Sequence, residues 1–200
     1  MAHASPRRIW LLGPGANPAD ALVLMLSGFT QEGRARDAAA LLGAALPHTL
    51  FAVLELDLDG TEPLLEVEAT IGELCLQLGL ASSQVILLAR GPAAGLALDA
   101  TLKGADPLCG VIVVDPPPLY APPSARRRGA RVRILQREFA DPDGARVRAL
   151  TRRLHAAEVD VRSLFLPNGG DDAPVLRAAE AFLAELTACA SRAGERRSGL

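Results

Sequence analysis

Short apolar runs alternate with longer stretches of helical periodicity along this chain, and this alternation constrains its fold more than any other feature. The runs are rich in leucine and β-branched residues and show little polar alternation, which is typical of strands buried on both faces of a parallel sheet. Runs predicted as strands lie at residues 9–12, 22–26, 50–54, 85–89, 111–115, 132–136 and 161–166. The pattern therefore predicts a mostly parallel central sheet with helices on both faces.

Helical periodicity fills the intervals between these runs. Helices are predicted at residues 34–46, 64–78, 92–103, 143–157 and 174–190. Pro92 and Pro174 suit the first turn of a helix, where a missing N–H costs nothing, and Gly79 and Gly104 suit the position just after a helix ends. Residues 13–18 form a Gly/Pro/Asn turn between the first two runs, so we expect those two strands to pair as an initial hairpin.

Length and composition favour a single domain. A chain of 200 residues is long enough for one core, and its 50% hydrophobic content and net charge of −2 exclude a disordered protein. We expect one domain over residues 1–190. Residues 191–200 are predicted to form a flexible polar tail.

Charge and cysteine content narrow the partners and the compartment. A net charge of −2 gives no basic surplus for nucleic acid, and no apolar run reaches the length of a membrane span. The cysteines Cys75, Cys109 and Cys189 have no metal-ligand spacing, so we interpret them as buried free thiols of a cytoplasmic protein.

One basic patch stands out, formed by residues 126–128 with Arg131 and Arg133. We interpret this patch as a solvated face, because runs of like charge usually lie in water. The alternative is that it docks an acidic partner.

Several segments resemble the phospholipase/carboxylesterase family of α/β-hydrolases, relatives of the acyl-protein thioesterases. The similar segments are LVLMLSGF (22–29), LASSQVILLARGPAAGLAL (80–98), PLCGVIVVD (107–115), ILQREFADP (134–142) and LPNGGD (166–171). The resemblance covers nearly the whole chain and implies an α/β-hydrolase fold with no large lid.

Enzymes of that family use a serine on a tight strand-to-helix turn, a histidine that takes its proton and an aspartate that orients the histidine. By this resemblance Gly91 occupies the nucleophile position and Asp171 the histidine position, while Asp141 retains the acid. Pro92 follows the nucleophile position, where the family uses a backbone N–H to stabilise the oxyanion, and proline has no N–H. The triad is therefore degenerate at Gly91, Asp141 and Asp171.

The same resemblance places other side chains at the carboxyl ends of the strands. Ser27 stands where the oxyanion loop usually has histidine, with Phe29 two residues later. Arg90, on the turn, is predicted to pair with a nearby carboxylate, Asp172 lying beside Asp171. Alternatively the crevice retains ligand binding through Ser27, Phe29, Arg90, Pro92 and Asp172, or a divalent cation is held by Asp141, Asp171 and Asp172. We expect no metal and no cofactor.

We therefore predict a pseudoenzyme of the phospholipase/carboxylesterase family with a binding or regulatory role and no serine-hydrolase activity. One alternative is a carboxylic-ester or thioester hydrolase with an unrecognised site. Another is a structural scaffold that oligomerises. The expected partner is an unidentified small ligand or protein, and a homodimer is a further expectation.

Overall fold

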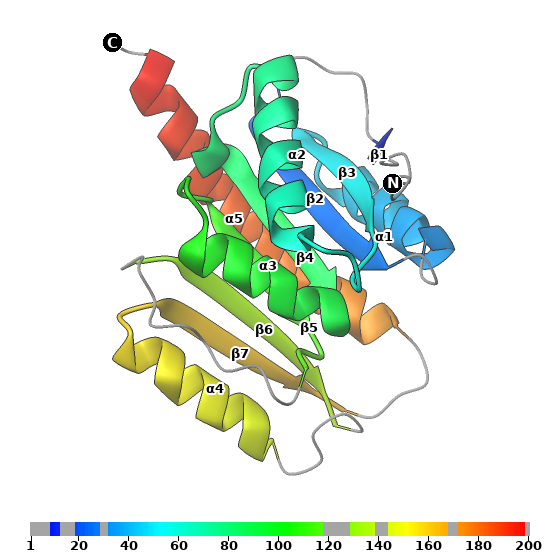
Figure 1. Ribbon diagram of the computed structural model, residues 1–200, viewed down its shortest axis with the longest axis vertical. Coiled ribbons are helices and arrows are strands. Elements are labelled where there is room, and N and C mark those ends of the chain that lie inside the picture. Colours follow the sequence, from blue (N-terminus) through cyan, green and yellow to red (C-terminus); the bar gives the residue numbers. More distant parts are fainter. Residues whose placement is uncertain are drawn as a thin grey trace.

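A mostly parallel sheet forms the centre of the computed structural model, which describes residues 9–12, 19–28, 32–117, 129–138, 144–167 and 172–198 (Figure 1). Its strands are β1 (Ile9–Leu12), β2 (Ala21–Gly28), β3 (Thr49–Leu56), β4 (Val85–Arg90), β5 (Gly110–Val114), β6 (Arg131–Arg137) and β7 (Asp160–Leu166). Their order across the sheet is β1-β3-β2-β4-β5-β6-β7, and only β1 runs antiparallel to its neighbour. The predicted mostly parallel sheet is confirmed.

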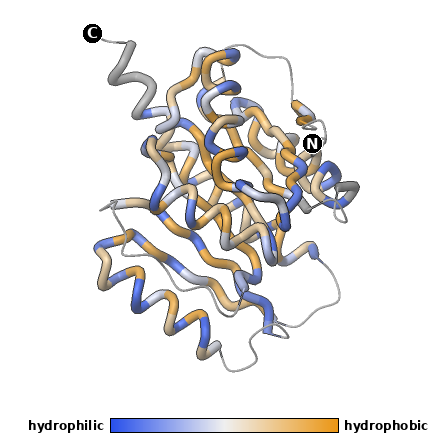
Figure 2. The backbone as a smooth tube through the Cα atoms, viewed as in Figure 1, coloured by the Kyte–Doolittle hydropathy of each residue, from blue (hydrophilic) through white to orange (hydrophobic). Residues whose placement is uncertain are grey.

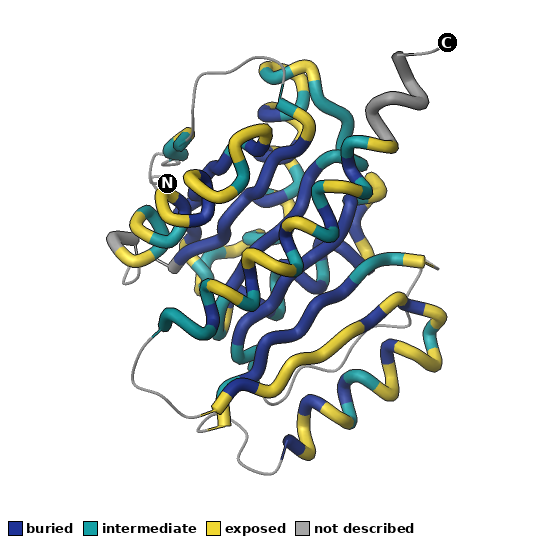
Figure 3. The backbone as a smooth tube through the Cα atoms, turned by 180° about the vertical axis from the view of Figure 1, so that it is seen from behind, coloured by how far each residue is buried: buried dark blue, intermediate teal, exposed yellow. Residues whose placement is uncertain are grey.

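Helices cover both faces of this sheet, as predicted (Figure 1). They are α1 (Glu32–Ala45), α2 (Pro63–Leu78), α3 (Pro92–Lys103), α4 (Ala145–Ala156) and α5 (Ala173–Ser198). Core side chains of α2, α3 and α4 pack on one face and those of α1 and α5 on the other. Figure 3, seen from behind, shows α5 crossing that second face. Among the described residues no helical lid is inserted between the strands.

The middle strands carry the apolar runs because both of their faces are covered. Every residue of β5 is buried, whereas β7 at the edge of the sheet exposes most of its residues (Figure 3). Hydrophobic residues accordingly concentrate in the central strands (Figure 2). Each fully buried leucine or valine contributes about 1.5–3 kcal/mol relative to an exposed one. This packing fixes the carboxyl ends of β2, β4, β5 and β6 at one edge of the sheet.

The predicted initial hairpin is wrong. β1 pairs antiparallel with β3, with Ile9 opposite Leu54, and β2 lies on the other side of β3. β2 is buried between β3 and β4, so both of its edges are already paired and β1 is left to pair with the outer edge of β3. The two runs are neighbours in the sequence, which favours a hairpin. The apolar strand β2 instead takes a central position in the sheet, where both of its faces are buried.

The last helix is longer than predicted. α5 continues to Ser198, so residues 191–198 belong to the helix and do not form a separate tail. No helix among the described residues is both long enough and apolar enough to cross a membrane.

The cysteines are free thiols, as predicted, but only one is fully buried. Cys109 is buried, while Cys75 and Cys189 are partly exposed. The Cys109 thiol donates to the carbonyl oxygen of Leu186 at 3.2 Å, and its burial raises its pKa to about 11. A thiol with so high a pKa is largely protonated at neutral pH and is a poor nucleophile.

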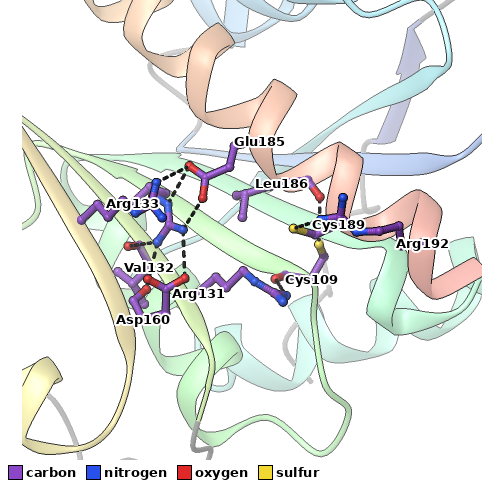
Figure 4. Close-up of polar contacts among 10 residues, drawn as sticks. Cys109, Arg131, Val132, Arg133, Asp160, Glu185, Leu186, Cys189 and Arg192 are labelled. Carbon is purple, nitrogen blue, oxygen red and sulfur yellow. Dashed lines mark hydrogen bonds and ion pairs between the residues drawn. The ribbon is translucent and has the colours of Figure 1, made fainter.

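Arg133 is buried, which corrects the prediction that it belongs to a solvated basic face. Its side chain, which comes from β6, is 0% exposed and contacts Asp160 of β7 and Glu185 of α5 (Figure 4). The guanidinium donates to Glu185 at 2.6 Å and to the carboxylate and carbonyl oxygens of Asp160 at 3.0 and 2.9 Å. Burial of the charge is tolerated because two carboxylates and two backbone carbonyls, of Asp160 and Val132, accept its hydrogen bonds. The Arg133 hydrogen bond holds the pKa of Glu185 below its ordinary value.

Glu185→Gln is expected to destabilise the fold by about 3 kcal/mol, because the buried guanidinium loses one of its two carboxylates. Urea denaturation measures this change in the free energy of unfolding. The loss should be full above pH 4.5, the ordinary pKa of the Glu185 carboxyl, and should shrink as the pH falls through its lowered folded pKa.

Arg162→Gln is the matched control, because Arg162 also contacts Glu185, at 3.4 Å, but is 61% exposed. That variant should lose less than about 0.5 kcal/mol. Equal losses in the two variants would contradict the structural role assigned to Arg133.

Candidate functional site

A sharp turn joins β4 to α3 at Gly91. Its φ of 59° and ψ of −129° lie in a strained region that residues with a Cβ atom rarely adopt. The Gly91 N–H donates to the carbonyl oxygen of Val114 at 2.9 Å, so the turn remains attached to β5. Pro92 then begins α3. This strand, turn and helix form the local structure that a nucleophile elbow requires.

The site beside Gly91 has room for a side chain. A Cβ atom built on Gly91 meets no other atom within 4 Å. The open space and the strained backbone are both present, but the atom that would carry a hydroxyl is absent. The helix also begins with a proline, so the first N–H after the turn is missing.

Asp115 anchors a cluster of charged residues next to this turn. It directly follows β5 and has a φ of 47°, which is uncommon for a residue other than glycine. Its carboxylate accepts hydrogen bonds from the backbone N–H of Arg137 at 2.9 Å and from Arg137 Nε at 2.7 Å. Arg90 Nε lies 3.7 Å from the same carboxylate. Asp115 thus orients the Arg137 guanidinium at the end of β6 and forms a longer ion pair with Arg90 at the end of β4.

Asp172 completes the cluster from the start of α5. Arg90 Nη1 donates to Asp172 Oδ2 at 3.0 Å, and Arg137 Nη1 donates to Oδ1 at 3.4 Å. The hydrogen bond from Arg90 lowers the pKa of the Asp172 carboxyl. The Asp172 side chain is nevertheless 40% exposed, against 10% for Asp115. Both carboxylates therefore contact the same two arginines, Asp115 from inside the protein and Asp172 from its surface.

A cavity of about 710 Å³ opens over this cluster, between the sheet and helices α1 and α5. Its charged lining consists of Arg34, Asp37, Arg90, Asp115, Arg137 and Asp172. Its apolar lining includes Met25, Ala38, Leu41, Leu42, Leu88, Val114, Val175, Leu176 and Ala179. Ligands commonly bind beyond the carboxyl ends of strands in open α/β sheets, and the volume is ordinary for a small-molecule site.

The structure brings some of the predicted site residues together. Ser27, Arg90, Gly91 and Asp172 all line the cavity, and Arg90 pairs with Asp172. Phe29, Asp141 and Asp171 lie outside the described residues. Ser27 is the only hydroxyl among the described lining residues, and no described histidine lines the cavity.

Four charged lining residues were not predicted as part of the site. Asp115 ends a predicted strand, Arg137 directly follows another, and Arg34 and Asp37 lie in the first turn of a predicted helix. A charged residue at the carboxyl end of a buried strand was the available signal, because parallel strands bring those ends to one edge.

The described residues do not form a metal centre. They contain no cluster of three or more potential histidine, cysteine or carboxylate ligands. Asp115 and Asp172 already accept from arginines, and an arginine beside a carboxylate disfavours a cation there.

Comparison with solved structures finds esterases. Esterase PE8 has a TM-score of 0.74 and 20% identity, over 91% of this chain and 100% of that one. A carboxylesterase from Mesorhizobium loti has a TM-score of 0.68 and 19% identity, over 87% and 92% of the two chains. A phospholipase/carboxylesterase from Dyadobacter fermentans has a TM-score of 0.62 and 16% identity, over 90% and 99%.

The structural similarity establishes the fold. Because the sequence identities are low, it does not establish the activity, which depends on the residues of the site. No protein-family model matches the sequence, and no curated protein matches it significantly.

Gly91→Ala is expected to destabilise the protein by about 1–3 kcal/mol, because a Cβ atom is strained at this backbone conformation although no neighbour obstructs it. Thermal or urea unfolding measures the change.

Gly72→Ala in α2 is the matched control, since its added Cβ also meets nothing within 4 Å but lies in a regular helix. It should stabilise the protein by about 0.5–1 kcal/mol. A Gly91→Ala variant as stable as the wild type would show that the turn at Gly91 is not the strained one described.

Proposed function

We propose that this chain, which has the α/β-hydrolase fold, is a non-catalytic member of that fold that binds a small ligand in the cavity over Gly91. The observation that carries the proposal is the glycine on the turn, where the chemistry of the fold needs a side-chain nucleophile. The carry-over of the nucleophile and histidine positions to Gly91 and Asp171 is part of the proposal.

The losses at the site argue against serine hydrolysis. Removing the serine or the histidine of such a triad costs on the order of a millionfold in rate. Removing one oxyanion donor, as Pro92 does at the start of α3, costs about a hundredfold to a thousandfold. These losses are not additive; loss of a triad member leaves about a thousandfold to ten-thousandfold enhancement over water, which itself depends on substrate binding and the oxyanion donors.

The cavity supports a binding role. It holds about 710 Å³ next to oriented charges, so it is large enough for a small ligand and can fix that ligand's orientation. Arg137 is hydrogen-bonded to Asp115 and Arg90 is paired with Asp172, so both guanidinium groups are ordered before a ligand binds, which reduces the ordering cost.

The proposal includes a cytoplasmic location, which the three free cysteines support, and a homodimer. It includes no nucleic-acid partner, because the net charge is −2.

Ester hydrolysis is the second candidate function. It is favoured by the likeness to esterases and by Ser27, whose hydroxyl lies on the same cavity. In that case Ser27 is the residue that would carry the acyl group.

A serine-directed fluorophosphonate probe separates the two candidates. We expect no covalent labelling of the wild-type protein by intact-mass spectrometry, and no hydrolysis of p-nitrophenyl esters above the buffer rate, while an active serine esterase in parallel is fully labelled.

Stoichiometric labelling would overturn the non-catalytic proposal. Ser27→Ala then identifies the nucleophile: loss of the label in that variant would establish Ser27 as the site of an ester hydrolase.

A further inference from the structure

We infer that the cavity binds the free carboxylate of an aliphatic acid, and that this carboxylate takes the place of Asp172 on Arg90 and Arg137. The inference rests on the proposed function and names its ligand class. It concerns an organic anion rather than a neutral ester, because Arg90 and Arg137 line the cavity and already bind a partly exposed carboxylate there, that of Asp172.

The two carboxylates of the cluster have different roles. Asp115 is nearly buried and is fixed by the backbone N–H and Nε of Arg137, so it belongs to the framework. Asp172 is 40% exposed and is held only through the outer nitrogens, Nη1 of Arg90 and Nη1 of Arg137. A ligand carboxylate can therefore replace Asp172 without disturbing Asp115.

The geometry of Asp172 shows what this end of the cavity recognises. Its Oδ2 accepts from Arg90 and its Oδ1 from Arg137, so one carboxylate spans two guanidinium groups that the sheet holds apart. Recognition of both oxygens of a carboxylate by arginine is strong and directional. An ester has no charge to pair with these arginines.

Charge balance makes replacement necessary. The charged lining contains the arginines Arg34, Arg90 and Arg137, and an equal number of aspartates, Asp37, Asp115 and Asp172. An added anion would leave the lining with an excess negative charge if Asp172 kept its place, and like charges at short range disfavour one another. The Asp172 side chain can rotate into the solvent, because it is already partly exposed at the start of α5.

The remainder of the cavity suits an aliphatic chain. Helix α1 contributes Ala38, Leu41 and Leu42, and α5 contributes Val175, Leu176 and Ala179. Leu41 is 62% exposed at the cavity although it is a large apolar residue. A chain lying between α1 and α5 would cover this leucine, and each buried methylene should tighten binding about fourfold.

Titration calorimetry with sodium octanoate, sodium decanoate and decanol tests the inference on the wild-type protein. Decanoate should bind at least tenfold more tightly than octanoate, as about fourfold per methylene requires, and decanol should bind at least about tenfold more weakly than decanoate.

Two variants test the exchange of carboxylates. Asp172→Asn leaves the arginines without their surface partner and should bind decanoate about tenfold more tightly, whereas Arg90→Gln should bind it at least about tenfold more weakly. Arg162→Gln is the matched control, because it removes an arginine whose contact is with Glu185, outside the cavity lining, and its affinity should equal that of the wild type. Thermal melts verify that each variant is folded.

Equal affinity for decanoate and decanol, or no effect of Arg90→Gln in a folded protein, would overturn carboxylate recognition. Absence of decanoate binding would overturn the ligand class while leaving the non-catalytic proposal intact. Labelling by the fluorophosphonate probe would overturn that proposal instead, so the two failures are distinguishable.

Discussion

The turn at Gly91 is the constraint on which the rest of the site depends. β4 is buried between β2 and β5, and its chain must reverse direction within one residue to begin α3 over the sheet. The turn places Arg90 at the end of β4 and ties Gly91 to Val114 of β5. The same backbone that would present a nucleophile therefore presents an arginine and an open space.

The charged cluster organises this space. Parallel pairing brings the ends of β4, β5 and β6 to one edge, and there Asp115 is hydrogen-bonded to Arg137 and paired at 3.7 Å with Arg90. Asp172 reaches the same arginines from α5 and remains partly in water. A hydrolase of this fold needs a hydroxyl and a base at this edge, whereas the function proposed above assigns the two arginines to an anionic ligand.

The sequence predicted the sheet and its helices because the apolar runs are long enough to require burial on two faces. It did not predict the pairing of β1, because the partner of a short strand depends on which edges of the sheet remain open. It misplaced Arg133 for a similar reason: the carboxylates that allow its burial, Asp160 and Glu185, are far away in the sequence.

The site was predicted from resemblance at individual positions, so residues outside the family's catalytic pattern were not predicted. The resemblance assigns roles to Asp141 and Asp171, which lie outside the described residues, and none to Asp115 or Arg137. Neither residue belongs to a catalytic pattern. Their significance comes from strand ends that meet only in the folded sheet.

A crystal structure of the protein grown with decanoate tests the central claim most directly. The account predicts a carboxylate bound to Arg90 and Arg137, an aliphatic chain between α1 and α5, and no serine, cysteine or threonine within hydrogen-bond distance of a base in the cavity. A serine beside a histidine or carboxylate base, with Arg90 turned out of the cavity, would contradict it and restore the hydrolase.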